Sequence, residues 1–205
     1  MIAVVDYGVG NLFSVACSLS SLGAEAVVTG DREVIKKCDR IILPGVGAFR
    51  DAAAKLQESG LDRIVCDEAR TGKPLLGICL GMQLLFNKSY EYGEYDGLSL
   101  IDGNIKPIKP IIPTDYKVPH IGWNALNFGS SKPKNPLFKY INEGDFVYFV
   151  HSYAAMDCDS SVIATTEYGV PLTAAVTNNN VFGTQFHPEK SGDVGLKILR
   201  AFCEM

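Results

Sequence analysis

The sequence has no cluster of basic side chains and no long hydrophobic run. Its 205 residues include 19 Lys and Arg against 23 Asp and Glu, which gives a formal net charge of -4. Binding to the phosphates of a nucleic acid requires clustered Lys and Arg, so we expect no nucleic-acid partner. No apolar stretch is long enough to cross a bilayer, and no basic segment precedes the apolar residues at the N-terminus. We therefore predict neither a membrane protein nor a signal peptide.

Paired cysteines and metal-binding patterns are also missing. The six cysteines are scattered, none forms a Cys-x-x-Cys pair, and none of the three histidines stands at the spacing of a metal ligand. These absences predict that the chain binds no metal, and they indicate reduced thiols in the cytoplasm. A free cysteine is usually a small buried apolar residue, so any chemical role must be argued for one particular cysteine.

Apolar runs of strand length alternate with segments of helical spacing in the first half of the chain. We predict strands at residues 2–5, 26–28, 40–43 and 75–78, and helices at residues 11–22, 48–59, 61–70 and from 82 onward. This alternation is typical of a parallel sheet with helices on both faces. Further strands are predicted at residues 146–150, 162–166, 172–177 and 181–185, with an extended excursion at 105–112 and a closing helix at 191–203. No linker or repeat divides the sequence, so we predict a single α/β domain over residues 1–205 with an open, mixed and mostly parallel sheet.

The segment Gly77-Ile78-Cys79-Leu80-Gly81 joins a predicted strand to a predicted helix. Gly-x-Cys-x-Gly is the thiol counterpart of the nucleophile elbow, a turn so tight that side chains at both glycine positions would collide. Such a turn presents the sulfur of Cys79 at the carboxyl end of a strand and at the start of a helix, where backbone N–H groups favour a thiolate. The pattern alone is equally compatible with a buried cysteine in an ordinary turn.

A thiol nucleophile requires a base, and the base requires an acceptor that orients it. His187 and Glu189 follow a predicted strand, and Pro188 fixes the backbone between them. If that strand runs parallel to the strand before Cys79, His187 lies at the same end of the sheet as the elbow. The order Cys, His, Glu is much more specific than either motif alone. We therefore predict a Cys79–His187–Glu189 triad.

Both motifs resemble those of the class I (triad) glutamine amidotransferase family, whose fold is flavodoxin-like. Pro44-Gly45-Val46-Gly47 is similar to the oxyanion segment of that family and follows the third predicted strand. Within the family, the segments at residues 6–11, 44–49, 119–124 and 148–153 resemble the glutaminase subunits of imidazole glycerol phosphate synthases, which act in histidine biosynthesis. The anthranilate, GMP and carbamoyl-phosphate relatives carry Pro-Gly-Gly where this sequence has Pro-Gly-Val-Gly.

The resemblance implies that Cys79 attacks the side-chain amide of glutamine and that His187 passes a proton to the departing ammonia. Water would then hydrolyse a γ-glutamyl thioester. The further site residues that it implies are Val46, Gly47 and Leu80 for the oxyanion and Gln83, Ser152 and Tyr153 for the backbone of glutamine.

The resemblance also implies a partner, a (β/α)8-barrel cyclase that takes the ammonia through an interior channel in a heterodimer. The cyclase would make imidazole glycerol phosphate and an aminoimidazole carboxamide nucleotide. Five residues resemble positions that face it: Asn11, Ile121, Trp123, Tyr148 and Lys190. Phe13 and Ser14 follow Asn11-Leu12 where relatives often carry Arg. No cofactor is implied.

Three other interpretations remain open at this stage. The chain could be the glutaminase of another class I enzyme, such as pyridoxal phosphate synthase, although Pro-Gly-Val-Gly and the segment at 120–124 disfavour it. It could be a flavodoxin-like interaction module with a relic site. It could also be a thiol hydrolase that acts alone on γ-glutamyl peptides.

Overall fold

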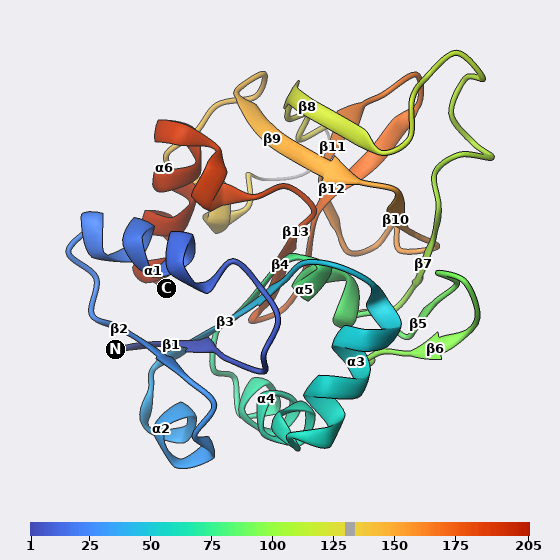
Figure 1. The fold of residues 1–205 in the computed structure, drawn as a ribbon. Helices are drawn as coiled ribbons and strands as arrows, with labels where there is room; N and C mark the ends of the chain where they lie inside the picture. Colours follow the sequence, from blue (N-terminus) through green and yellow to red (C-terminus); the bar gives the residue numbers. More distant parts are fainter. Residues whose placement is uncertain (130–133) are drawn as a thin grey trace.

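The computed structural model describes residues 1–129 and 134–205, and in this part of the chain a seven-stranded sheet forms the centre (Figure 1). Its strands are β1 (Ile2–Val5), β2 (Ala26–Thr29), β3 (Arg40–Gly45), β4 (Leu75–Cys79), β11 (Val162–Glu167), β12 (Pro171–Asn178) and β13 (Val181–Thr184). The order across the sheet is β11-β12-β13-β4-β3-β1-β2. Neighbours from β2 to β13 pair in parallel, whereas β12 and β11 continue antiparallel. The predicted mixed, mostly parallel sheet is confirmed.

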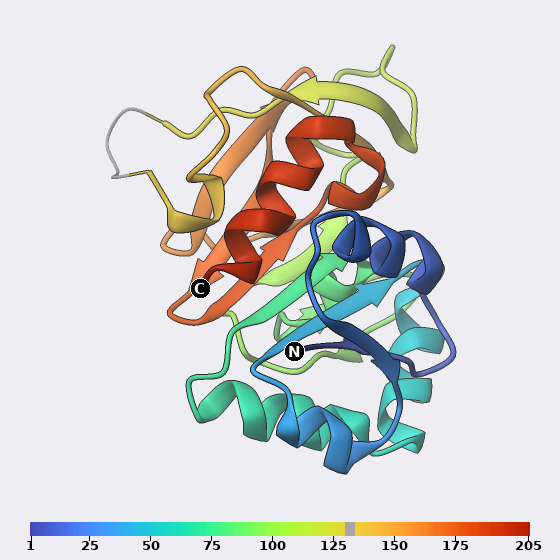
Figure 2. The ribbon, with the colours of Figure 1, turned by 90° about the vertical axis from the view of Figure 1, so that its left-hand side faces the viewer.

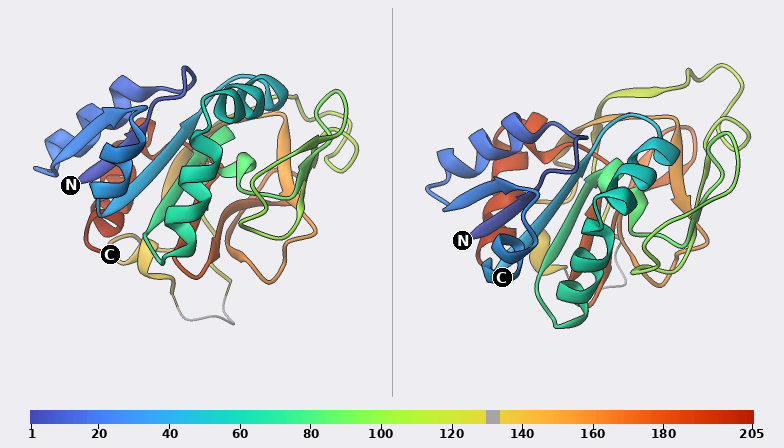
Figure 3. Two further views of the ribbon diagram at one scale, coloured as in Figure 1. Left: turned by 90° about the horizontal axis from the view of Figure 1, so that it is seen from below. Right: turned by 60° about the horizontal axis from the view of Figure 1, so that its bottom comes forward.

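Helices cover both faces of this sheet, as predicted (Figures 2 and 3). They are α1 (Leu12–Ser21), α2 (Arg32–Lys37), α3 (Phe49–Glu58), α4 (Leu61–Arg70), α5 (Leu80–Leu84) and α6 (Gly192–Cys203). Side chains alternate along a strand, so β1 sends Ile2 and Val4 into the layer beneath α1 and α6. Ala3 and Val5 enter the other layer, with α2, α3 and α4. Because both faces are buried, β1 reads as one continuous apolar run.

The chain after α5 adds two smaller β-structures to the described fold. A four-stranded sheet contains β5 (Lys88–Ser89), β6 (Tyr95–Asp96), β7 (Asn104–Pro107) and β10 (Tyr153–Met156). A two-stranded ribbon contains β8 (His120–Ala125) and β9 (Phe146–His151). Two short 3-10 helices are η1 (Pro136–Phe138) and η2 (Pro188–Lys190). The ribbon passes directly into β10 through Ser152, which brings this part of the chain to the carboxyl end of the central sheet.

Several predicted boundaries were wrong. β3 continues through Pro44 and Gly45, where we predicted a break, because these residues still pair with Ile78 and Cys79. α5 begins at Leu80 rather than Met82, and the extended excursion at 105–112 is a strand only to Pro107. Among the described residues, no helix is long and apolar enough to cross a membrane.

Candidate functional site

The turn around Cys79 has the tight geometry that its two glycines predicted. Cys79 ends β4 with φ 54° and ψ -109°, and such a positive φ is rare for a residue with a side chain. A Cβ atom on Gly77 would lie 2.7 Å from the Gly81 carbonyl oxygen, and one on Gly81 would lie 1.8 Å from the Leu43 carbonyl oxygen. Backbone therefore occupies the space that side chains at 77 and 81 would need. The turn places a thiol at the carboxyl end of the parallel sheet.

His187 reaches the same end of the sheet because β13 runs parallel to β4, with Thr184 beside Ile78. Its Nδ1 lies 2.8 Å from Oε1 of Glu189, and the two side chains are 2% and 1% exposed. Burial disfavours the charged imidazole, but the interactions with Cys79 and Glu189 outweigh burial and raise the pKa of His187 to about 9. A carboxylate accepts only, so Nδ1 carries a proton toward Glu189 and Nε2 is left for proton exchange with the sulfur.

A single cavity of about 320 Å³ brings the predicted residues together at this sulfur. Cys79 and His187 line it, while Glu189 lies behind His187. All six residues predicted for the oxyanion and for glutamine line the same cavity: Val46, Gly47, Leu80, Gln83, Ser152 and Tyr153. They come from three separate parts of the chain, namely the end of β3, the elbow and the junction of β9 with β10. The volume suits one small amino acid rather than a large ligand.

The end of β3 lies against the elbow, and the segment of Val46 and Gly47 follows it. A Cβ on Gly45 would be 2.6 Å from the Gly81 nitrogen, so the two backbones touch. Val46 is 40% exposed. Gly47 has φ 95°, and no described heavy atom lies within 4 Å of the place where its Cβ would be. Glycine at 47 therefore permits a backbone conformation, and a change of it, that most residues resist.

The sequence reasoning missed three polar side chains in or next to this cavity, those of Glu91, Gln185 and His151. Glu91 lines the cavity from the loop between β5 and β6, and its Oε2 accepts from the Phe49 N–H at 2.5 Å. Gln185 is fully buried, donates to the Cys79 sulfur at 3.8 Å and accepts from Gln83 at 3.0 Å. Its position as an amide between the strand Val181–Thr184 and buried Phe186 was the available signal, because buried polar groups need partners. Nothing local distinguishes Glu91 from a solvated loop residue.

His151 is the third missed residue, and it forms part of the cavity wall. Its Nδ1 contacts the Tyr153 carbonyl at 2.9 Å, and its Nε2 lies 3.0 Å from Nδ1 of the buried His120. Burial lowers the pKa of His151 to about 4, so this ring is neutral at physiological pH. A neutral, internally bonded imidazole is suited to shaping the wall rather than to accepting the thiol proton.

The residues predicted to face a partner lie close to this site. Trp123 pairs with Tyr148 across the ribbon, with ring centroids 6.0 Å apart, and Ile121 and Trp123 are 58% and 52% exposed. Asn11 approaches Glu189, Nδ2 to Oε1, at 3.5 Å, and exposed Lys190 is the next residue in the chain. The structure thus places Asn11 and Lys190 beside Glu189, and it places Tyr148, whose carbonyl accepts from the His187 N–H, beside His187. Ile121 and Trp123 lie on the strand that pairs with β9. Phe13, two positions after Asn11, is also exposed.

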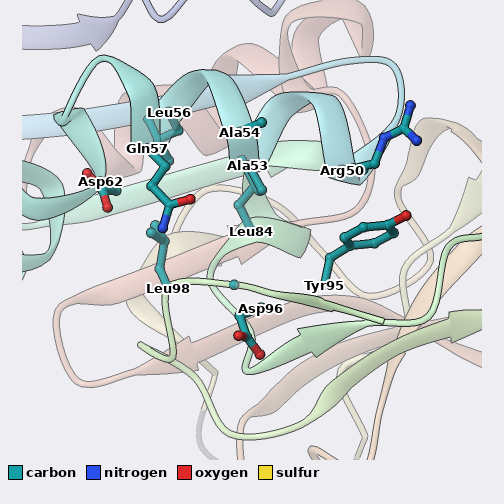
Figure 4. Close-up of a pocket in the computed structure, with 11 residues that line it drawn as sticks. Arg50, Ala53, Ala54, Leu56, Gln57, Asp62, Leu84, Tyr95, Asp96 and Leu98 are labelled. Atoms are coloured by element: carbon teal, nitrogen blue, oxygen red, sulfur yellow. The ribbon is translucent and has the colours of Figure 1, made fainter. Parts of the chain in front are cut away.

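A second pocket, of about 280 Å³, lies between α3, α4 and the segment that follows β6. Figure 4 shows Gln57 and Asp62 on its helical side and Tyr95 and Asp96 across from them. It is lined by no cysteine and no histidine, so it offers no nucleophile–base pair. Within residues 1–129 and 134–205, no group of three or more His, Cys, Asp or Glu is arranged to hold a metal ion.

Relatives with high identity cover the whole sequence. The chain is 48% identical over 204 residues to the imidazole glycerol phosphate synthase subunit HisH of Lactococcus lactis, with 99% of this chain and 98% of that protein covered. It is 47% identical over 207 residues to the subunit of the same name from Wolinella succinogenes, with both chains covered completely. The HisH of Caldanaerobacter subterraneus is 47% identical over 206 residues, with 100% and 98% covered.

Solved structures share the fold at low identity. A crystal structure of a glutamine amidotransferase superposes with a TM-score of 0.75 and 18% identity, covering 100% of this chain and 98% of that one. The PurLQS structure from Thermotoga maritima gives a TM-score of 0.74 and 20% identity over 99% and 97%. The model of the family described as glutamine amidotransferase class-I matches residues 3–205. With its sequence, fold and relatives in agreement, the chain belongs to the class I glutamine amidotransferase family.

Proposed function

We propose that this chain is the glutaminase subunit of an imidazole glycerol phosphate synthase, acting in histidine biosynthesis as a single amidotransferase domain over residues 1–205. The observation that carries the proposal is the cavity at the elbow. A buried thiol, an imidazole paired with a carboxylate, and a loop with backbone freedom all meet there. The three HisH relatives, at 47–48% identity over essentially the whole chain, support the choice of enzyme.

The proposed reaction begins with attack of the Cys79 sulfur on the side-chain amide carbon of glutamine. The negative charge that develops on the amide oxygen needs preorganised donors, each worth about 10²–10³ in rate. Leu80 at the elbow and the segment of Val46 and Gly47 line the same cavity as Cys79 and can present backbone N–H groups. Proton transfer from His187 to the amide nitrogen then releases ammonia and leaves a γ-glutamyl thioester on the sulfur.

Hydrolysis of the thioester completes the proposed cycle. Water loses a proton to His187 and attacks the thioester carbon, after which glutamate departs and the thiolate is restored. Glu189 keeps the imidazole oriented and stabilises its charged form in both steps. Gln83, Ser152 and Tyr153 would bind the amino-acid end of glutamine, while Glu91 supplies a carboxylate on the same cavity wall that can face its ammonium group.

A (β/α)8-barrel cyclase is the proposed partner, in a cytoplasmic heterodimer. The exposed aromatic and aliphatic side chains around the triad suit a partner, since aromatic residues dominate the energetics of interfaces. We propose that the subunit alone is nearly inactive because Val46 does not present its N–H until the partner is bound. A ligand of the cyclase would shift that equilibrium only if it favours the competent state. This gating would avoid the wasteful release of ammonia.

The test is glutamate release at saturating glutamine by the chain alone, with the cyclase, and with the cyclase and its nucleotide ligand. We expect a large increase across the series and its loss in Cys79→Ala, while synthesis driven by added ammonium salt survives in the variant. Cys66→Ala is the matched control, because Cys66 is a buried thiol on α4. Full activity of the chain alone, or cleavage of γ-glutamyl peptides without a partner, would instead identify a stand-alone hydrolase. Co-purification with a pyridoxal phosphate synthase barrel would identify the other amidotransferase.

A further inference from the structure

The carboxyl end of β3 extends past its neighbour β1. The recorded pairs between β1 and β3 end at Val4 and Ile42, whereas β3 remains paired with β4 as far as Gly45 and Cys79. Pro44 lies in this extension, two positions before Val46, the first of the two residues that we propose for the oxyanion. A proline has no N–H to donate, so its carbonyl is the hydrogen-bonding group through which its backbone can be held.

Tyr7 holds that carbonyl. Its hydroxyl donates to the Pro44 oxygen at 2.8 Å, in a buried hydrogen bond, and the tyrosine is only 5% exposed. Burial and the charge of Cys79 raise the pKa of Tyr7, so the hydroxyl keeps its proton and remains a donor. The loop that contains Tyr7 also packs against Pro44, since a Cβ on Gly10 would come within 3.2 Å of the proline ring.

The residues that follow Pro44 have fewer restraints on the cavity side. Val46 is 40% exposed, and the space beside Gly47 is open among the described atoms. The orientation of their peptides therefore depends on how the chain leaves Pro44. Without the hydroxyl, the buried carbonyl of Pro44 would lose its Tyr7 donor, and rotation of that peptide toward another donor would be favoured.

We propose that Tyr7 is a positioning residue for glutamine hydrolysis, which fixes the Pro44 peptide and through it the oxyanion donors beside Cys79. This inference rests on the proposed function. Tyr7 need not touch the substrate, and it does not line the cavity. It acts in the transition state, because the charge that the donors stabilise develops only there.

The test uses Tyr7→Phe in the complex with the cyclase, which removes one oxygen atom and keeps the buried ring. We expect kcat for glutamine hydrolysis to fall at least about 10-fold, which is part of the effect of losing one oxyanion donor, while KM stays within about threefold. Alkylation of Cys79 by iodoacetamide should keep its parental rate and pH profile, since it requires the thiolate but no oxyanion donor. The kcat values are expressed per Cys79 that iodoacetamide can alkylate, so that a misfolded fraction of the protein does not lower the measured kcat. Tyr168→Phe is the matched control, because Tyr168 also donates to a backbone carbonyl, that of Lys117 at 2.9 Å.

A parental kcat in Tyr7→Phe would overturn the proposal while leaving the proposed function intact. Equal losses of hydrolysis and of alkylation would also overturn it, because they would place the effect on the nucleophile instead. A rise in KM without a fall in kcat would assign Tyr7 to ground-state binding and contradict positioning. If the proposed function itself is wrong, the complex of the parent chain with the cyclase will release no glutamate, which separates that failure from a failure of the Tyr7 proposal.

Discussion

Gly81→Ala is expected to disable the site by moving the end of β3 away from Cys79. The new Cβ would stand 1.8 Å from the Leu43 carbonyl oxygen. A carbon–oxygen contact needs about 3.3 Å, so the two backbones must separate by about 1.5 Å. The displaced carbonyl directly precedes Pro44, and the oxyanion segment must move with it. A misplacement of about 1 Å can cost about 10²-fold in rate, so we expect a loss of at least that size in kcat.

The assay is glutaminase kcat in the cyclase complex together with unfolding in denaturant. Overpacking of this kind costs about 1–3 kcal/mol of stability, so a folded variant can be measured. Gly97→Ala is the matched control, because its Cβ would lie 2.1 Å from the Phe86 carbonyl oxygen, beside the second pocket rather than the elbow. Both variants should lose stability, and only Gly81→Ala should lose the large factor in kcat. Parental kcat in Gly81→Ala, or equal kcat losses in both, would refute the reasoning.

Three further predictions follow from the same geometry. Glu189→Gln should bind glutamine normally but lose kcat, by less than Cys79→Ala, because the imidazolium loses its partner charge; an unchanged kcat would remove Glu189 from the triad. The pKa of His187 rises from 6.5 to about 9 in the folded state, so the folded protein binds the imidazole proton more tightly than the unfolded chain does. This proton contributes at most about 3 kcal/mol to the free energy of unfolding; the contribution is fully present below pH 6.5 and is lost as pH rises to about 9. Chemical unfolding of the parent and of His187→Gln measures it, and an equal pH dependence of stability in the two proteins would contradict the prediction. Trp123→Ala should weaken cyclase binding by about 2 kcal/mol, roughly 30-fold in Kd. Ile111→Ala, which also removes an exposed apolar side chain, should leave the affinity unchanged. Calorimetric titration that gives Trp123→Ala the affinity of the parent would exclude Trp123 from the interface.

Most of the central sheet could be predicted because its signals are local. The strand at Ile2–Val5 and the helix at Leu61–Arg70 have the predicted bounds, since one is an apolar run and the other follows Gly60, whose φ is 64°. α2 was missed because six residues are too short to establish a helical period, although Asp31 caps it by accepting from Glu33 and Val34. β8 was missed because Ile121 and Trp123 point to solvent, against the usual pattern of burial.

The candidate site was predictable where its chemistry lies within a short motif. The elbow and the segment of His187 and Glu189 carry their own spacing, and the sheet brings them together through the pairing of β4 with β13. Only the tertiary fold brings Glu91 into the cavity of Cys79 and Gln185 into contact with its sulfur, and Tyr7 is separated from Pro44 by 37 positions. A single sequence contains no spacing rule for such contacts.

The most direct test of the central claim is trapping of the thioester on Cys79. The cyclase complex is mixed with glutamine, quenched in acid within one turnover, digested, and analysed by mass spectrometry for a glutamyl group on the peptide that contains Cys79. We expect the modification on this cysteine in the parent complex and its absence from Cys79→Ala. Glutamate release without any Cys79 adduct, or with the adduct on another of the six cysteines, would contradict the account.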